Sequence, residues 1–261
     1  YIISIIYTPI MLRLLGQSEY GLYNLVASVV SYLGLLSFGF GSAYVRYYSR
    51  YKVNNDEKNI AKLNGMFLTV FIIIGFIALF AGGILVINTE LIFGEKLTVS
   101  ELSTAKVLMA IMVFNLSLSF PASVFNSYIT ANEEYIFQKL LQMVKVVISP
   151  LVMLPVLLMG FKSIGMVVVT TILNITVEIA NVAFCFKKLK IKFSFHKFDF
   201  ALMKEMAIFS SYIFLNMIID QINWSIDKFI LGRFRGTIAV AVYGLAAQLN
   251  SYYLSLSTAI S

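Results

Sequence analysis

Residues 62–87 read KLNGMFLTVFIIIGFIALFAGGILVI and carry a single charge, at their first residue, Lys62. A transmembrane helix needs about 20 mostly apolar residues, so this stretch predicts a helix that crosses a membrane. The composition of the whole chain agrees, because 59% of the residues are hydrophobic and only 13% are charged, against roughly 25% charged in soluble domains. A chain of 261 residues with this composition has more apolar side chains than one water-soluble core can bury.

Further apolar runs of similar length flank this stretch and are separated by short loops. Together they predict eight membrane-spanning helices, at 1–15, 20–44, 62–87, 103–127, 137–159, 163–185, 207–231 and 237–261. The first run starts at Tyr1 without a Met or a basic leader, and the last run extends to Ser261, so we expect both ends to be truncation points. The predicted class is an all-α polytopic membrane protein.

Lysine and arginine are divided unevenly between the two alternating sets of loops. Twelve lie in one set: Arg46, Arg50, Lys52, Lys58, Lys62, Lys139, Lys187, Lys188, Lys190, Lys192, Lys197 and Lys204. Six lie in the other: Arg13, Lys96, Lys106, Lys162, Arg233 and Arg235. Cytoplasmic loops are the richer in Lys and Arg, so the N-terminus and the loop 187–206 are predicted to be cytoplasmic and the loop around Glu95 external. This bias explains the net charge of +7 without a nucleic-acid partner.

A shift of 220 residues aligns the first two predicted helices with the seventh and eighth. It pairs Gly16 with Gly236, Tyr23 with Tyr243, Leu25 with Leu245, Ala27 with Ala247, Ser31 with Ser251 and Tyr32 with Tyr252, without a gap. Because an even number of helices separates the copies, both should point the same way, as in parallel repeats about an axis along the membrane normal. A chance match between two apolar helices is the alternative.

The repeat predicts a division of the chain into three parts. These are a six-helix lobe at 1–186, a basic cytoplasmic linker at 187–206, and the first two helices of a truncated second lobe at 207–261. The complete protein would then be a transporter of 12–14 helices.

Polar residues recur inside several spans at helical spacing, so that each set shares one face of its helix. The sets are Asn216, Asp220, Asn223 and Asp227; Thr171, Asn174, Glu178 and Asn181; Gln138, Gln142, Lys145 and Ser149; and Gln248, Ser251 and Ser255. A carboxylate at the centre of a membrane helix is unfavourable by about 2.5–3.5 kcal/mol, which favours a shared polar interior for Asp220 and Glu178. Hydrogen bonding between packed helices is the alternative, above all for the Asn and Ser residues, and Lys145 is near enough to its helix end to reach the interface.

Motifs of catalysis and metal binding are absent from the sequence. Gly39-Phe-Gly41 has no βαβ unit around it, and HExxH, Walker A and GxSxG do not occur. One cysteine, Cys185, cannot form a disulfide within the chain or a cysteine-based metal cluster. We therefore predict that the protein is not an enzyme and holds neither a metal nor an organic cofactor.

Several stretches carry a resemblance to a known family. TPIMLRLLGQSEYGLY at 8–23 and SFGFGSAYVR at 37–46 resemble the opening of the polysaccharide transporter and O-antigen flippase family, which belongs to the multidrug/oligosaccharidyl-lipid/polysaccharide exporter superfamily. ANEEYIFQK at 131–139 resembles the family's cytoplasmic turn between helices four and five. DKFILG at 227–232, with VAVY at 240–243, resembles its passage from helix seven to helix eight. The resemblance spans the whole chain.

The resemblance implies two six-helix lobes around a central cavity in the bacterial inner membrane. The implied activity is the flipping of an undecaprenyl-diphosphate-linked oligosaccharide to the outer leaflet by alternating access, in the setting of membrane lipid and polysaccharide assembly proteins. Cationic side chains would attract the diphosphate, polar amides would bind the glycan, and carboxylates would bind a coupling proton or Na⁺. The candidates are Arg46, Lys145, Arg13 and Lys228 for the diphosphate, Asn216, Asn223 and Gln248 for the glycan, and Asp220, Asp227 and Glu178 for the coupling ion.

Two other functions stay open at this point. An ion-coupled drug or cation antiporter of the same superfamily would use the same carboxylates to hold a cationic substrate. A membrane-bound polysaccharide polymerase or ligase should have a long external loop that bears a site, and the longest predicted external loop here has only about 15 residues.

Overall fold

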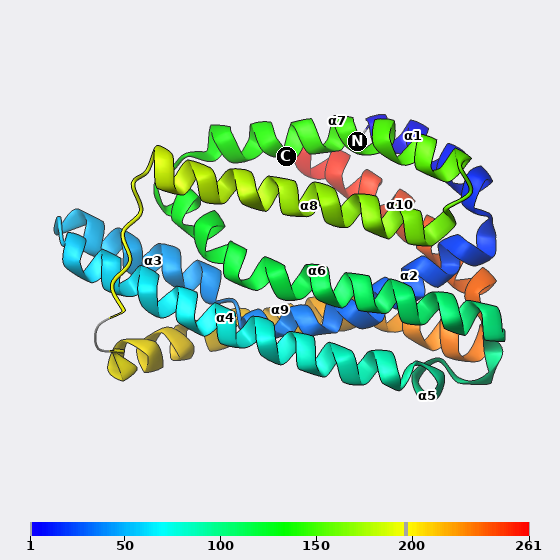
Figure 1. Cartoon of the computed structure of the whole chain (residues 1–261), viewed down its shortest axis with the longest axis horizontal. Helices are drawn as coiled ribbons and strands as arrows, with labels where there is room; N and C mark the ends of the chain where they lie inside the picture. The colour runs from blue at the N-terminus through cyan, green and yellow to red at the C-terminus, as the bar shows by residue number, and fades with distance from the viewer. Residues whose placement is uncertain (1, 196–197, 261) are drawn as a thin grey trace.

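The computed structural model describes residues 2–195 and 198–260, and every regular element within them is helical. The α-helices are α1 (Ile2–Leu15), α2 (Gln17–Ser31), α3 (Phe40–Val53), α4 (Glu57–Ile87), α5 (Thr89–Phe93), α6 (Val99–Ala131), α7 (Tyr135–Leu158), α8 (Lys162–Lys187), α9 (Phe200–Arg235) and α10 (Thr237–Ile260). Two 3-10 helices, η1 (Tyr32–Ser37) and η2 (Gly94–Lys96), complete the set. The longer helices run along the long axis of the molecule (Figure 1).

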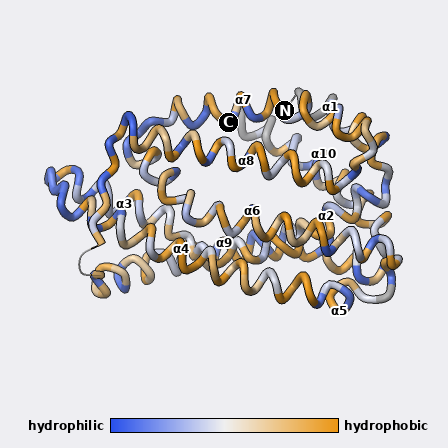
Figure 2. The backbone as a smooth tube through the Cα atoms, in the orientation of Figure 1, coloured by the Kyte–Doolittle hydropathy of each residue, from blue (hydrophilic) through white to orange (hydrophobic). Residues whose placement is uncertain are grey.

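Six helical segments of the described chain are long and apolar enough to cross a membrane, which confirms the predicted class. They are Gln17–Val53, Glu57–Ile87, Val99–Ala131, Tyr135–Leu158, Lys162–Lys187 and Phe200–Arg235. Apolar residues predominate along these helices and hydrophilic ones gather toward the ends of the molecule (Figure 2). Two of the eight predicted spans are not among the six. α1 has 14 residues, fewer than a span needs, and α10, with 24 residues, mixes its apolar residues with Gln248, Asn250 and Ser251.

The predicted span 20–44 lies within the span-length segment Gln17–Val53, but the α-helix inside that segment is interrupted. The chain passes from α2 into the 3-10 helix η1 and then breaks at Phe38 and Gly39, which have φ angles of 50° and 69°. The break brings the chain close to α9, because the Phe38 ring stacks on Phe214 at 4.3 Å. A Cβ added at Gly39 would lie 2.6 Å from the Cγ2 of Ile213. A glycine is therefore required at this crossing for both its backbone conformation and its size.

The loops separate onto two ends of the molecule. The turns α3–α4 and α6–α7 and the connection α8–α9 lie at the left end in Figure 1, which we call the basic end; the turns α1–α2, α7–α8 and α9–α10 and the α5 region lie at the opposite end. The two predicted sets of Lys and Arg divide between these ends, Lys197 lying outside the described residues. The structure thus confirms the division of the loops, while their cytoplasmic or external location stays a prediction.

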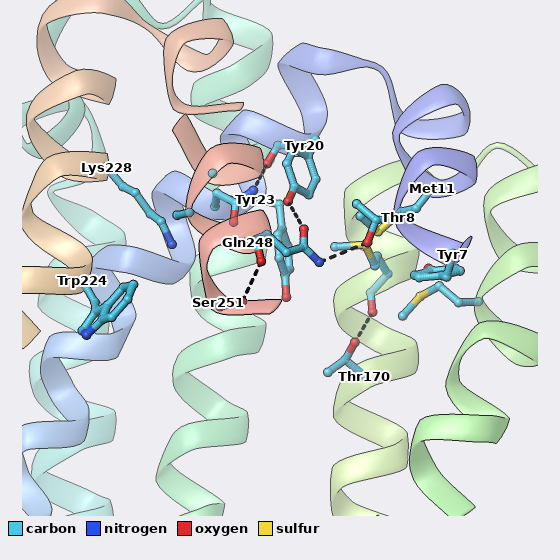
Figure 3. A pocket seen from close by; sticks show the side chains of 15 residues that line it. Tyr7, Thr8, Met11, Tyr20, Tyr23, Thr170, Trp224, Lys228, Gln248 and Ser251 are labelled. Atoms are coloured by element: carbon cyan, nitrogen blue, oxygen red, sulfur yellow. Dashed lines mark hydrogen bonds between the residues drawn. The ribbon is translucent and has the colours of Figure 1, made fainter. Parts of the chain in front are cut away.

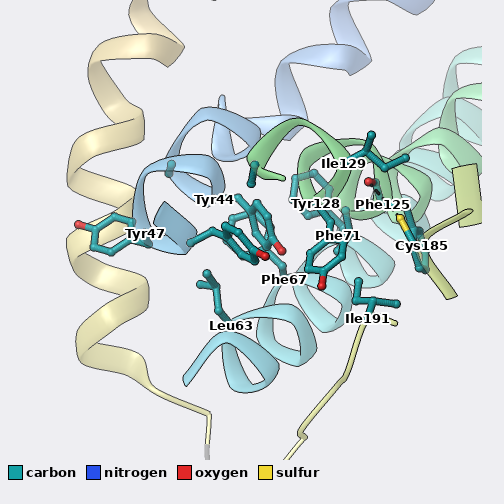
Figure 4. Close-up of a cluster of buried hydrophobic side chains, with 14 of the residues drawn as sticks. Tyr44, Tyr47, Leu63, Phe67, Phe71, Phe125, Tyr128, Ile129, Cys185 and Ile191 are labelled. Atoms are coloured by element: carbon teal, nitrogen blue, oxygen red, sulfur yellow. Dashed lines mark hydrogen bonds between the residues drawn. The ribbon is translucent and has the colours of Figure 1, made fainter. Parts of the chain in front are cut away.

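A cluster of buried aromatic and aliphatic side chains forms the core near the basic end (Figure 4). Tyr44 and Phe67 lie edge to face at 4.8 Å, and Tyr48 and Tyr128 do the same at 5.4 Å. The Tyr44 hydroxyl donates to the Oδ1 of Asn64 at 2.5 Å, so a buried polar group is satisfied inside this apolar core. α3, α4 and α6 are packed together by these contacts.

The predicted linker 187–206 is partly helical and is held against α4. α9 already begins at Phe200, because the Asp199 carboxylate caps it by accepting from the Leu202 N–H at 3.1 Å. Residues 188–195, which we call the linker strap, lie along the start of α4. The Asn64 Nδ2 donates to the Lys192 carbonyl at 2.8 Å, and the Ser194 N–H donates to the Ala61 carbonyl at 2.8 Å.

Gly65→Ala is expected to loosen the linker strap from α4. A Cβ at Gly65 would lie 2.3 Å from the Ser194 carbonyl oxygen, a backbone atom that cannot rotate away, and such overpacking costs about 1–3 kcal/mol. We expect a lower melting temperature and faster proteolysis within 188–199. Gly83→Ala, on the same helix, is the matched control, because an added Cβ meets nothing within 4 Å there. Equal proteolysis rates for the two variants would contradict the packing argument.

The 220-residue offset recurs in the structure. Gly16 and Gly236 have φ angles of 79° and 82°, and α2 and α10 begin directly after them, at Gln17 and Thr237. Both helix pairs turn at the same end of the molecule (Figure 1), as a parallel repeat requires. Paired positions also meet where α2 and α10 cross, since a Cβ at Gly21 would lie 3.3 Å from the Ala241 Cβ. This contact between equivalents is expected of two helices related by a two-fold axis; the superposition of the full repeats stays a prediction.

Candidate functional site

A cavity of about 460 Å³ lies between the first helices of the chain and the α9–α10 pair, and we call it the central cavity. Its lining comes from α1, α2, α7, α8, α9 and α10: Tyr7, Thr8, Met11, Tyr20, Tyr23, Asn24, Met153, Met166, Thr170, Trp224, Lys228, Gly244, Ala247, Gln248 and Ser251. In Figure 3, Lys228 and Trp224 lie on one side, Tyr7 and Met11 on the other, and Gln248 between them. The cavity combines aromatic faces with hydrogen-bonding groups, which is the surface that a polar, ring-bearing ligand needs.

Gln248 is held in place by three hydroxyl groups from three helices. The Tyr20 hydroxyl donates to its Oε1 at 3.1 Å, and its Nε2 donates to the Thr8 Oγ1 at 3.0 Å and to the Tyr252 hydroxyl at 2.7 Å. These contacts join α10 to α1 and α2 across the cavity. They satisfy most of the hydrogen-bonding capacity of the amide and fix its orientation.

Lys228 contributes a cation to the central cavity from α9. The residue is half-buried, and among the described residues its ammonium has no hydrogen bond or ion pair. A lysine inside a membrane span is stable only where water or a counter-charge reaches it. The position therefore favours a wet cavity or an anionic ligand.

A second cavity, of about 370 Å³, lies between α6, α7 and α8, and we call it the lobe cavity. It is lined by Asn126, Gln138, Leu141, Gln142, Lys145, Asn174, Val177, Glu178 and Asn181. A third space of about 310 Å³ shares Asn174 and Glu178 with the lobe cavity, and shares Tyr23 and Thr170 with the central cavity. The polar sets of α7 and α8 thus meet around one cavity, and a line of polar side chains on α8 leads from it to the central cavity.

The polar set of α9 lies elsewhere. Asn216, Asp220 and Asn223 are exposed in the described chain, and Asn223 lines a separate cavity of about 450 Å³ with Trp224, Tyr243 and Asn250. The Asp227 carboxylate accepts a hydrogen bond from the Tyr243 hydroxyl of α10. The structure therefore does not bring the α9 carboxylates together with Glu178.

Two of the predicted cations lie outside these cavities. Arg13 is exposed in the last turn of α1. Arg46 is exposed on α3, and its guanidinium lies 4.5 Å from the centroid of the Phe209 ring of α9. Arg46 thus joins α3 to α9, and its predicted contact with a diphosphate stays untested.

The end of the molecule opposite to the basic end is closed by side-chain contacts. The spacing of residues in the sequence could not predict these contacts. Thr98 and Glu101 form a capping box at the start of α6, and the Glu101 Oε1 also accepts from Ser18 at 2.6 Å and from Thr237 at 2.9 Å. Arg233 of α9 donates to the carbonyls of Leu91 and Ile92 at 3.0 and 2.8 Å. Glu101 and Arg233 therefore hold α9 and α10 against α2, α5 and α6.

Ion pairs outside the spans lower the pKa of two carboxyl groups. The Lys62 ammonium donates to the Asp199 carboxylate at 2.9 Å and, with the Leu202 N–H, lowers the pKa of Asp199. Lys106, which donates to Glu90 at 2.8 Å, lowers the pKa of Glu90. A lowered folded-state pKa stabilises the fold above the ordinary carboxyl pKa, and this stabilisation is lost as the pH falls through the lowered value.

Groups of His, Cys, Asp and Glu that could hold a metal ion are not found within the described residues.

The amino-acid sequence matches a family model described as polysaccharide biosynthesis protein over residues 1–261. No curated protein and no solved structure matches the chain. The family match runs from α1 to α10 and agrees with the membrane-spanning helices and the polar cavities between them. The chain belongs to the polysaccharide biosynthesis protein family.

Proposed function

We propose that this chain is part of a flippase that moves a lipid-diphosphate-linked oligosaccharide across the bacterial inner membrane by alternating access. The family supports a role in polysaccharide synthesis or export. The observation that carries the proposal is the central cavity, where the ammonium of Lys228, unpaired among the described residues, lies among aromatic and amide side chains inside the membrane-spanning bundle. The protein would be a multi-pass transporter with a cytoplasmic N-terminus, and not an enzyme.

The chemistry of such a substrate matches the lining of the central cavity. The lipid tail can stay in the bilayer while the headgroup crosses through a wet space. The diphosphate would be bound by Lys228 through charge-assisted hydrogen bonds. The glycan would stack on Trp224, donate a hydrogen bond to the Gln248 Oε1 and form a hydrogen bond with the Tyr23 hydroxyl.

Alternating access requires one end of the cavity to close while the other opens. Glu101 and Arg233 supply a closure opposite to the basic end, through hydrogen bonds that can break and re-form without changes in the helices themselves. The predicted orientation would make this the external side. Asp220, Asp227 and Glu178 are the groups proposed to bind the coupling proton or Na⁺.

An ion-coupled antiporter for an organic cation is the second candidate. The exposed face of α9 favours it, because Asp220 lies near Asn223 and Trp224 and could hold a cation by charge and by ring stacking. A polymerase or ligase has less support.

The complete protein, reconstituted in vesicles that contain a lipid-diphosphate-linked oligosaccharide, tests the proposal. A membrane-impermeant enzyme that cleaves the glycan reports how much substrate faces outward. We expect the protected inner pool to become cleavable only when the protein is present. A pool that stays protected, with accumulation of a fluorescent organic cation instead, would establish the antiporter.

Asp220→Asn is expected to keep the protein folded in the membrane and to lower transport or alter its pH dependence. The amide keeps the size and polarity of the side chain and removes its charge and titration. The measurement is the initial flipping rate across a pH series, with protein level determined in parallel. Glu205→Gln, an exposed carboxylate of the same helix near the basic end, is the control. Wild-type rates with an unchanged pH profile would leave Asp220 a structural contact.

A further inference from the structure

One face of α8 presents a row of oxygen atoms to the lobe cavity. Asn174, Glu178 and Asn181 are spaced by four and three residues, which places them on one side of the helix, and all three line the cavity. Amide and carboxylate oxygens are the ligands that hard cations prefer in proteins. The row therefore has the chemistry of a cation site.

Asn181 shows that this oxygen row is not fully satisfied within the protein. Its side chain is only 4% exposed, and its Nδ2 donates to the Oδ1 of Asn126 at 2.8 Å. Its own Oδ1 is buried and has no hydrogen-bond partner in the part of the chain that the structure describes. A buried polar atom without a partner is costly in a membrane protein, so this oxygen points to an occupant of the cavity that donates hydrogen bonds or coordinates.

The cation nearest to the row belongs to the chain itself. Lys145 reaches into the lobe cavity from α7, and its ammonium donates a hydrogen bond to the Oδ1 of Asn174. Glu178 lies one helical turn beyond Asn174 and lines the same cavity as Lys145, so one space holds the two opposite charges. An ammonium group and a small monovalent cation carry the same charge and bind the same kinds of oxygen atom.

We propose that the lobe cavity is a monovalent-cation site that the protein fills with its own cation, the ammonium of Lys145. The site then needs no free Na⁺ while Lys145 is present, and removing the ammonium creates a vacancy that a free cation fills. Lys145 becomes the residue that excludes free cations from Glu178, so that Asp220 and Asp227 remain as the groups for a coupling ion and the diphosphate is left to Lys228. The proposal concerns cation occupancy and does not depend on which substrate is flipped.

The test measures the melting temperature of the purified complete protein in NaCl and in N-methylglucamine chloride at equal ionic strength. We expect no difference for the wild type or for Lys139→Gln, an exposed lysine of the same helix. For Lys145→Gln, Na⁺ should raise the melting temperature by about 3 °C or more, because a ligand that binds the folded state stabilises it. Lys145→Gln combined with Glu178→Gln should lose this response.

Each other outcome decides the question. A Lys145→Gln protein that does not respond to Na⁺, K⁺ or NH₄⁺ would overturn the proposal, as would a wild-type protein that responds as strongly as the variant. If Lys145→Gln cannot be recovered folded but the double variant can, the carboxylate requires a counter-cation and the proposal stands. If neither variant folds, Lys145 serves packing and the proposal fails.

Discussion

Replacing Gly21 by alanine is expected to lower the free energy of unfolding of the complete protein by about 1–3 kcal/mol. An added Cβ would lie 1.9 Å from the Thr237 carbonyl oxygen and 2.7 Å from its carbonyl carbon. Both are backbone atoms at the start of α10, so the clash can be relieved only if α10 moves away from α2. A loss of stability would be informative, because a Gly→Ala substitution within a helix otherwise stabilises a protein by roughly 0.5–1 kcal/mol.

The movement of α10 should also weaken closure of the end opposite to the basic end. Thr237, whose backbone would be displaced, is the residue whose hydroxyl donates to Glu101. Denaturant unfolding measures the stability, and the flipping rate measures the functional effect. Gly34→Ala is the control within the same membrane span, because nothing lies within 4 Å of a Cβ there. Equal stabilities of the two variants would show that α2 and α10 do not pack as closely as described.

The helices themselves were predictable from the sequence, because in a membrane the apolar run alone specifies them. The stretch 62–87 lies inside α4, and the Gly16–Gly236 pair marks two helix starts at the predicted offset. The break at Phe38 and Gly39 was not predictable in this way, since an apolar run has the same composition whether it is continuous or broken. The closely spaced glycines Gly39 and Gly41 were the available signal.

The candidate site was predictable only in part, because spacing identifies the face of a helix but not the helix opposite to it. The α7 and α8 sets do meet in the lobe cavity, whereas the α9 set faces away from it. The aromatic lining of the central cavity was missed, since Tyr20 and Tyr23 look like ordinary apolar residues within a span. The partners of Glu101 could not be predicted either, because Ser18 and Thr237 lie 83 and 136 residues away in the chain.

Lys228→Gln is expected to lower the flipping rate by roughly 10- to 100-fold with little change in protein level. A hydrogen bond to a charged group contributes about 1.5–3 kcal/mol, and about 1.4 kcal/mol corresponds to a factor of ten in rate. Loss of the ammonium should not destabilise the fold, because Lys228 has no ion pair among the described residues that would be left with an unpaired charge. The effect should therefore fall on the anionic part of the substrate.

A comparison of substituents separates charge from shape at this position. Lys228→Arg keeps the positive charge and should retain part of the rate, whereas Lys228→Gln keeps a hydrogen-bond donor without the charge. Arg235→Gln removes an exposed cation from the last turn of the same helix and should leave the rate unchanged. If Lys228→Gln transports at the wild-type rate, the diphosphate does not bind at Lys228, and the anion contact must come from another cation such as Arg46. A different result is that Lys228→Arg accumulates in the membrane but Lys228→Gln does not. A positive charge at this position would then be needed for folding, and Lys228 would no longer be evidence that the central cavity binds an anionic substrate.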